Sequence, residues 1–183
     1  MTALETAPEE TAPGAPAAID AEYRALLALA QMLRDYPSPE TPVEALQHVA
    51  DLARELTDAR YAALAVTDEH DRTEGFVTSG LTRDELRGLR TPPQAHGPLG
   101  SLRGDGRPVR ISNLEQDPHA FGFPPRHPQM KTLMGVPVWA SKQVRGSLYV
   151  TDKHGADPFE DEDEAILSVL ALHAARVIEE RWY

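Results

Sequence analysis

Three stretches of the chain carry apolar residues at the three- and four-residue spacing of an amphipathic helix. The first covers residues 21–35 and ends before Pro37 and Pro39, which cannot continue a helix. Its predicted apolar stripe consists of Leu26, Leu27, Leu29, Ala30 and Leu33. The second begins near Thr41, a residue type that caps helices, with a proline at the first helical position. The third begins with the acidic run at 159–164, since acidic residues stabilise a helix N-terminus. The pattern therefore predicts three long helices.

Between the second and third helices, the apolar positions follow the shorter period of β-strands. Two predicted hairpins have the strands ARYAALAVTD with EGFVTSG, and TLMGVPVWA with QVRGSLYVTDK. PVRISNL predicts a further short strand, and residues 82–90 predict a short helix. The strand TLMGVPVWA is apolar on both faces, so the sheet is expected to be covered on each side. This order of elements predicts an α+β sandwich with an antiparallel sheet.

Composition places these elements in one domain. The chain has 183 residues, of which 41% are hydrophobic, enough for one core. Residues 1–20 are mostly Ala, Pro, Glu and Thr, with almost nothing large to bury, so we expect a disordered tail before a single domain at 21–183.

Charge and cysteine content narrow the range of functions. A net charge of −11 would repel phosphate backbones and anionic membranes, so nucleic acid is not an expected partner. No apolar run approaches the roughly 20 residues that span a bilayer, and no secretory signal is visible, so we expect a cytoplasmic protein. With no cysteine, the chain cannot use disulfides, a catalytic thiolate, a cysteine zinc site or a thioether-linked cofactor.

The pair MGVPV and GSLYVTDK, followed by the acidic helix start PFEDEDEAIL, resembles the GAF domain family over roughly residues 22–180. The resemblance implies a GAF-type antiparallel sheet of five to six strands, with the terminal helices on one face and ligand-binding loops on the other. GAF domains are small-molecule sensor modules. The resemblance therefore also implies a role in signal transduction, a protein partner for signalling, and a homodimer formed through the terminal helices.

A narrower resemblance depends on DARY, GFPPRHPQM and GSLYVTDK. Together they are similar to the haem-binding first GAF domain of the actinobacterial dormancy-sensor histidine kinases. This resemblance implies haem b, with His127 as the axial iron ligand and Tyr149 on the distal side. The signal would be a diatomic gas (O₂, NO or CO) or the redox state of the iron.

Two features depart from those kinases. They carry an acid and a second histidine on the first sheet strand, where this chain has Ala65 and Thr67, so the distal side is changed. The kinase region is also missing, and we expect a GAF protein that stands alone and is not a kinase.

The residues themselves suit such a ligand. Haem iron needs a neutral imidazole beside an apolar slot. Pro128 disfavours the α conformation at His127, so the imidazole is presented from an extended segment. Strand alternation places Tyr149 on the face opposite Leu148 and Val150, toward the ligand side. Four further residues near the histidine are expected to form apolar walls: Phe121, Phe123, Met130 and Leu133.

Alternatives remain at this stage. His96 and His119 lie in loops, and either is a candidate second ligand. The chain is also compatible with a GAF module for a non-haem small molecule, in which His127 is only structural. A third reading is a haem enzyme whose open distal side reacts with peroxide or nitrogen oxides. A methionine-sulfoxide reductase and a covalent bilin photoreceptor are excluded, because both need cysteine.

Overall fold

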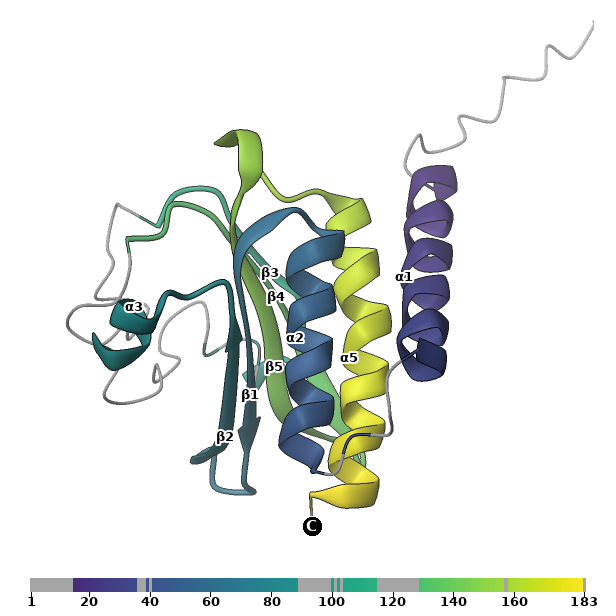
Figure 1. Cartoon of the computed structure of the whole chain (residues 1–183), viewed down its shortest axis with the longest axis vertical. Coiled ribbons are helices and arrows are strands. Elements are labelled where there is room, and N and C mark those ends of the chain that lie inside the picture. The colour runs from purple at the N-terminus through teal and green to yellow at the C-terminus, as the bar shows by residue number, and fades with distance from the viewer. Residues whose placement is uncertain are drawn as a thin grey trace, which may run out of the picture.

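A computed structural model describes residues 15–35, 39, 41–88, 100, 102, 104–114, 129–156 and 158–182. Along the chain it contains α1 (Ala15–Asp35), α2 (Pro42–Leu56), β1 (Ala59–Thr67), β2 (Thr73–Ser79), α3 (Arg83–Gly88), β3 (Val109–Ile111), β4 (Leu133–Ala140), β5 (Gln143–Lys153), the 3-10 turn η2 (His154–Ala156) and α5 (Asp161–Arg181). Figure 1 shows α1, α2 and α5 on one side of the sheet and α3 on the other. Within these ranges, no helix is both long and apolar enough to cross a lipid bilayer.

The five strands form one antiparallel sheet in the order β2-β1-β5-β4-β3. β1 and β5, which come from the two separate hairpins, pair in the middle of this sheet. The predicted α+β class with an antiparallel sheet is therefore confirmed, with five strands. The two predicted hairpins and the short strand are confirmed as well.

The sheet has an apolar layer on each face. Leu64, Leu148 and Val150 belong to the larger core beneath α2 and α5. Ala63 and Tyr149 belong to a smaller cluster on the opposite face. The two sets alternate along β1 and β5, because successive side chains of a strand point to opposite faces. The predicted facing of Tyr149 away from the helices is confirmed.

The N-terminus of α2 is capped by Thr41, as the sequence predicts. The backbone N–H of Glu44 donates to Thr41 Oγ1 at 3.2 Å, and the backbone N–H of Thr41 donates to Glu44 Oε2 at 3.1 Å. Pro42 occupies the first helical position, where its missing N–H has no partner to lose. This reciprocal capping box fixes the start of the helix that lies across β1 and β2.

α1 differs from its prediction in two ways. It begins at Ala15, so the expected boundary between tail and domain at residue 20 falls inside the helix, whose first turns contain alanines that favour helix. Residues 1–14 lie outside the described residues. Its buried stripe also differs: small side chains allow a close approach to α5, whereas Leu26, Leu27 and Leu33 are 56%, 46% and 61% exposed. The buried residues are Ala21, Ala25, Leu29 and Met32.

The carboxylate of Asp68 stabilises the turn between β1 and β2 by accepting hydrogen bonds within it. Asp68 Oδ1 accepts from the backbone N–H of His70 at 2.8 Å and of Arg72 at 2.9 Å, and Oδ2 accepts from Arg72 Nε at 2.7 Å. The backbone hydrogen bond from Arg72, helped by the other donors, lowers the pKa of Asp68 to about 2. The charged form is therefore favoured in the folded protein.

This shift makes stability depend on pH. Because the folded pKa of about 2 lies below the ordinary 3.8, the contribution of Asp68 is present above roughly pH 4 and is lost as the pH falls toward 2. We expect Asp68→Asn to lower the free energy of unfolding at pH 6 and to flatten its dependence on pH between 4 and 2, in urea titrations. The control Glu69→Gln, in the same turn and exposed, should keep the wild-type slope. Equal slopes for Asp68→Asn and wild type would contradict this account.

Candidate functional site

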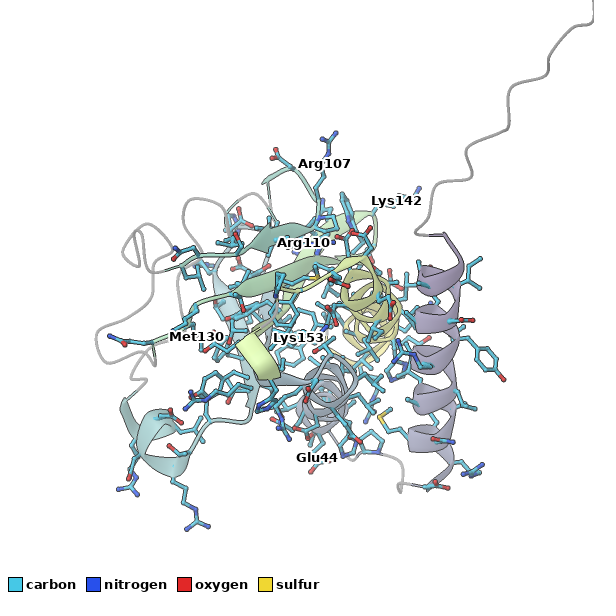
Figure 2. The ribbon with its side chains drawn as sticks, turned by 90° about the horizontal axis from the view of Figure 1, so that it is seen from above. Glu44, Arg107, Arg110, Met130, Lys142 and Lys153 are labelled. Atoms are coloured by element: carbon cyan, nitrogen blue, oxygen red, sulfur yellow. The ribbon has the colours of Figure 1, made fainter. Side chains whose placement is uncertain are left out.

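A small, partly open cavity of about 20 Å³ lies on the sheet face opposite α2 and α5. Strands β1, β2 and β5 form its floor. Leu81, which lies shortly before α3, and Met130, which lies shortly before β4, also line it. Figure 2 shows Met130 on the side of the sheet away from α1. The lining is mostly apolar and consists of Tyr61, Ala62, Ala63, Phe76, Thr78, Leu81, Met130, Tyr149 and Thr151. A cavity of this size has room for about one water molecule.

Strand pairing brings the floor residues together. Ala63 of β1 lies opposite Thr78 of β2 on one side and opposite Tyr149 of β5 on the other. Tyr61 lies opposite Thr151 in the same way. Since paired residues share a face, these side chains form one continuous surface. The small side chain of Ala63 lies between the larger side chains of Thr78 and Tyr149 on this surface.

The sequence-predicted site residues have different outcomes. Tyr149 and Met130 both line the cavity. Leu133 is fully buried in the cluster beneath it, with Leu102 and Leu114, and does not line it. The remaining predicted residues, His127, Phe121 and Phe123, together with the alternative ligands His96 and His119, lie outside the described residues.

Sequence reasoning missed several lining residues. Phe76 and Thr78 come from β2, Leu81 precedes α3, and Thr151 lies near the end of β5. No motif marks Phe76, Thr78 or Leu81, because they join the site only through the pairing of β1 with both neighbours. Thr151 lies in the motif GSLYVTDK, but its role in the lining was not predicted. The period-two alternation of β5 was the available signal for Thr151, since it shares a face with Tyr149.

Tyr61 connects the cavity to α3. Its hydroxyl donates to Glu85 Oε1 at 2.9 Å, while Glu85 Oε2 accepts from both the backbone N–H and the hydroxyl of Thr82 at 2.8 Å. Burial, and then the bond to Glu85, raises the pKa of Tyr61. The pKa of Glu85 is lowered, chiefly by the backbone N–H of Thr82. The pair is thus a neutral phenol donating to a charged carboxylate at neutral pH.

Polar groups elsewhere around the cavity are few. Thr151 is 1% exposed, and its Oγ1 is buried without a hydrogen-bond partner among the described residues. In the part of the chain that the structure describes, no group of three or more His, Asp or Glu side chains is placed to hold a metal ion. The described lining is therefore mainly apolar, with few groups that could hydrogen-bond to a bound molecule.

Residues 39–179 match the sequence profile of the GAF domain family. The chain belongs to this family. The GAF fold, with its antiparallel sheet and flanking helices, agrees with the structure described above. GAF domains are commonly small-molecule sensors in signalling proteins, which is also the general role that the sequence predicted for this chain.

Solved structures share this GAF fold. The GAF domain of a phosphoenolpyruvate-protein phosphotransferase from Coxiella burnetii is 21% identical, with 86% of this chain and 94% of that chain covered and a TM-score of 0.67. A GAF domain/HD domain protein from Geobacter sulfurreducens is 22% identical, covering 75% and 91%, with a TM-score of 0.63. Free methionine-R-sulfoxide reductase from Neisseria meningitidis is 17% identical, covering 97% and 95%, with a TM-score of 0.59. At these identities the likeness concerns the fold alone.

Proposed function

We propose that this GAF domain is a sensor module that binds haem b in the cavity on the sheet, with His127 as the axial iron ligand. The signal would be a diatomic gas or a change in iron redox state, passed to another protein. One observation carries the proposal: Met130 lines the cavity, and it ends the motif GFPPRHPQM. His127 precedes it by three residues, a length of chain that spans at most about 11 Å.

The described lining is apolar, as haem requires, but the cavity of about 20 Å³ is far smaller than a haem, so binding would require the residues that line it to move apart. The small side chain of Ala63 lies in the floor, and Phe76 and Met130 supply apolar walls. Tyr149, 9% exposed, brings an aromatic ring with a polar end to the same surface. Bound haem would supply reversible gas binding or electron exchange at its iron. The chain's own part is to hold the macrocycle, to exclude water from it and to present polar groups at its edge.

The test is a titration of the purified protein with haemin, followed by absorbance before and after reduction. Saturable binding at one haem per chain, with a shifted Soret band that changes on reduction and on addition of CO, is the expected result. An unshifted Soret band throughout the titration would overturn the proposal. A molecule without iron that remains bound through purification would instead identify a GAF module for another ligand. Turnover of peroxide or nitrite by the loaded protein would identify a haem enzyme.

We also propose that α1 joins two copies of the chain. Its outer face exposes Ile19, Tyr23, Leu26 and Leu33, and with Ala30 these residues follow the alternating four- and three-residue spacing of a two-stranded helical seam. α5 already covers the opposite face of α1. A twofold contact uses the same patch on both copies, so this one stripe suffices for a dimer.

Light scattering coupled to size exclusion tests the dimer. Wild-type protein should elute with twice the chain mass, and Leu26→Ser/Leu33→Ser should elute as a folded monomer. Val43→Ser on α2 is the control, because Val43 is an exposed apolar residue outside the stripe. A monomeric wild type, or a dimer that survives the double substitution, would contradict the proposal.

A further inference from the structure

A second cavity, here called the helix cavity, lies among the three long helices on the other side of the sheet. Its volume is about 240 Å³, roughly the space of eight water molecules in the liquid. The described lining comes from α1, α2, α5 and Pro39, and α1 and α2 each pack on α5. Figure 1 shows these three helices together, on the side of the sheet away from α3. Spaces between packed helices are common sites for small ligands.

Buried apolar side chains form much of the wall of the helix cavity. Met32 of α1, Ala45 of α2 and Val177 of α5 all line it, and all three are buried. Each of the three helices therefore contributes an apolar side chain to the same enclosed surface. An apolar molecule placed against this wall leaves water, which is favourable in proportion to the area that it buries.

The charged part of the described lining has a net positive charge. It consists of Arg176, Arg181 and Glu180, and Arg176 pairs with Glu180 one turn along α5. With the histidines counted as neutral, one positive charge is left over, in a chain whose net charge is −11. Arg181 Nη2 donates to the carbonyl oxygen of Pro39 at 2.8 Å, which holds this guanidinium at the wall of the cavity. Guanidinium groups bind carboxylates through two parallel N–H···O bonds.

His173 of α5 adds a hydrogen-bond donor to the same wall. Burial lowers the pKa of His173, so the imidazole is neutral at pH 7 and carries one N–H group. With the described residues around it, this side chain makes no hydrogen bond or ion pair. The helix cavity thus combines an apolar wall, a guanidinium and an imidazole donor.

We propose that the helix cavity binds a small monocarboxylate with an apolar body, of the kind that a medium-chain fatty acid represents. The carboxylate pairs with Arg181 and accepts a hydrogen bond from His173, and the apolar body lies against Met32, Ala45 and Val177. A carboxylate carries one negative charge, which matches the charge of the lining, whereas a phosphate monoester carries nearly two. The proposal is independent of haem, because this cavity lies on the opposite face of the sheet from Tyr149 and Met130.

The experiment uses three probes with the same alkyl chain: octanoate, octylammonium and octanol. Protein labelled with carbon-13 in its methionine methyl groups is titrated with each probe and followed by NMR. Met32 lines the helix cavity, Met130 lines the cavity on the sheet, and Met134 lies in the core beneath α2 and α5. The methyl signals therefore report which part of the molecule each probe reaches.

Two variants test the role of the guanidinium. Arg181→Met removes it, and Arg24→Met is the matched control, because Arg24 is an exposed arginine of α1 that pairs with Glu162 and is not part of the cavity lining. The melting temperature without any probe is measured for both variants and for wild type, so that a loss of binding can be separated from a loss of folding.

We expect octanoate to shift the Met32 signal saturably, at one molecule per chain, and to leave the Met130 signal in place. Octanoate should bind wild-type protein at least about tenfold more tightly than octanol or octylammonium does. In Arg181→Met this preference for octanoate over octanol should disappear, while octanol still binds. Arg24→Met should match wild type with all three probes.

Other results overturn the inference. If octanoate shifts no methionine signal, or shifts Met130 and not Met32, the helix cavity does not bind it. Equal affinities of wild-type protein for octanoate and octanol would show that the carboxylate is not recognised. Loss of octanol binding in Arg181→Met, together with octanoate binding, would mean that Arg181 only shapes the cavity.

If Arg181→Met does not fold, the wild-type comparison of octanoate with octylammonium decides, and equal affinities for these two probes overturn the proposal. The haemin titration is a separate measurement on the other face of the sheet. Failure of the proposed haem function therefore leaves this inference standing, and the reverse is also true.

Discussion

Alanine in place of His127 is expected to weaken haem binding by roughly a hundredfold or more, since even losing a group that only orients a metal ligand costs about 10- to 100-fold. The imidazole lone pair is the bond that attaches haem iron to a protein of this kind, and the chain has no cysteine to replace it. The Soret band of the variant should resemble that of free haemin over a titration that saturates wild type. Added free imidazole should restore part of the wild-type spectrum.

His70→Ala is the matched control for this substitution. His70 is an exposed histidine in the turn after β1, and it is not part of the cavity lining. The control should bind haemin as wild type does and should keep the same Soret position. If His127→Ala also keeps the wild-type band and affinity, His127 is not the axial ligand, and His96 or His119 becomes the residue to replace next.

The second large effect concerns stability. Lys153 Nζ lies 3.0 Å from Asp163 Oδ1 and 2.8 Å from Oδ2, and Asp163 is only 3% exposed. Asp163 Oδ2 also accepts from the backbone N–H of Glu160 at 2.8 Å, at the start of α5. Lys153→Met leaves this buried carboxylate without its cation. We expect the free energy of unfolding, measured in urea at pH 7, to fall by about 3 kcal/mol.

Arg110→Met is the control for that measurement, and Figure 2 labels both cations near the middle of the view from above. Arg110 pairs with Asp161 at 2.7 Å and with Glu164 at 3.1 Å, in a more solvent-exposed setting. Water screens such pairs, so its loss should cost less than about 1 kcal/mol. Equal losses for the two variants would show that burial does not set the strength of the Lys153 pair.

Adding Asp163→Asn to Lys153→Met should recover part of the lost stability. The double variant removes the buried charge together with its partner, and the asparagine oxygen can still accept from the backbone N–H of Glu160. A double variant that is less stable than Lys153→Met alone would mean that the carboxylate contributes through the helix N-terminus and not through the lysine.

Much of the fold could be read from local patterns. The Thr41-Pro42 pair marks the start of α2, and the acidic run marks the start of α5, because each satisfies backbone groups of its own helix. The strand alternation that separates Tyr149 from Leu148 acts over adjacent residues. Patterns of this kind depend only on the chain close to each residue.

The buried face of α1 could not be read in that way. Leu26, Leu27 and Leu33 give the stronger apolar signal, yet they are exposed, and the buried stripe consists of Ala21, Ala25, Leu29 and Met32. Both stripes satisfy a helical period, so the period does not choose between them. The choice depends on how closely α5 approaches, which is set by side chains on a helix more than a hundred residues away along the chain.

The sequence by itself therefore determined the elements, the faces of the strands and the histidine motif that suggested haem. The tertiary structure alone decided that β1 pairs with β5, which brings Tyr61 beside Thr151. It also decided that the hydroxyl of Tyr61 reaches Glu85 of α3 and that the hydroxyl of Thr151 has no hydrogen-bond partner in the part of the chain that the structure describes. The physical reason is that a strand's period fixes which residues share a face, whereas contacts between distant segments determine which residues meet on it.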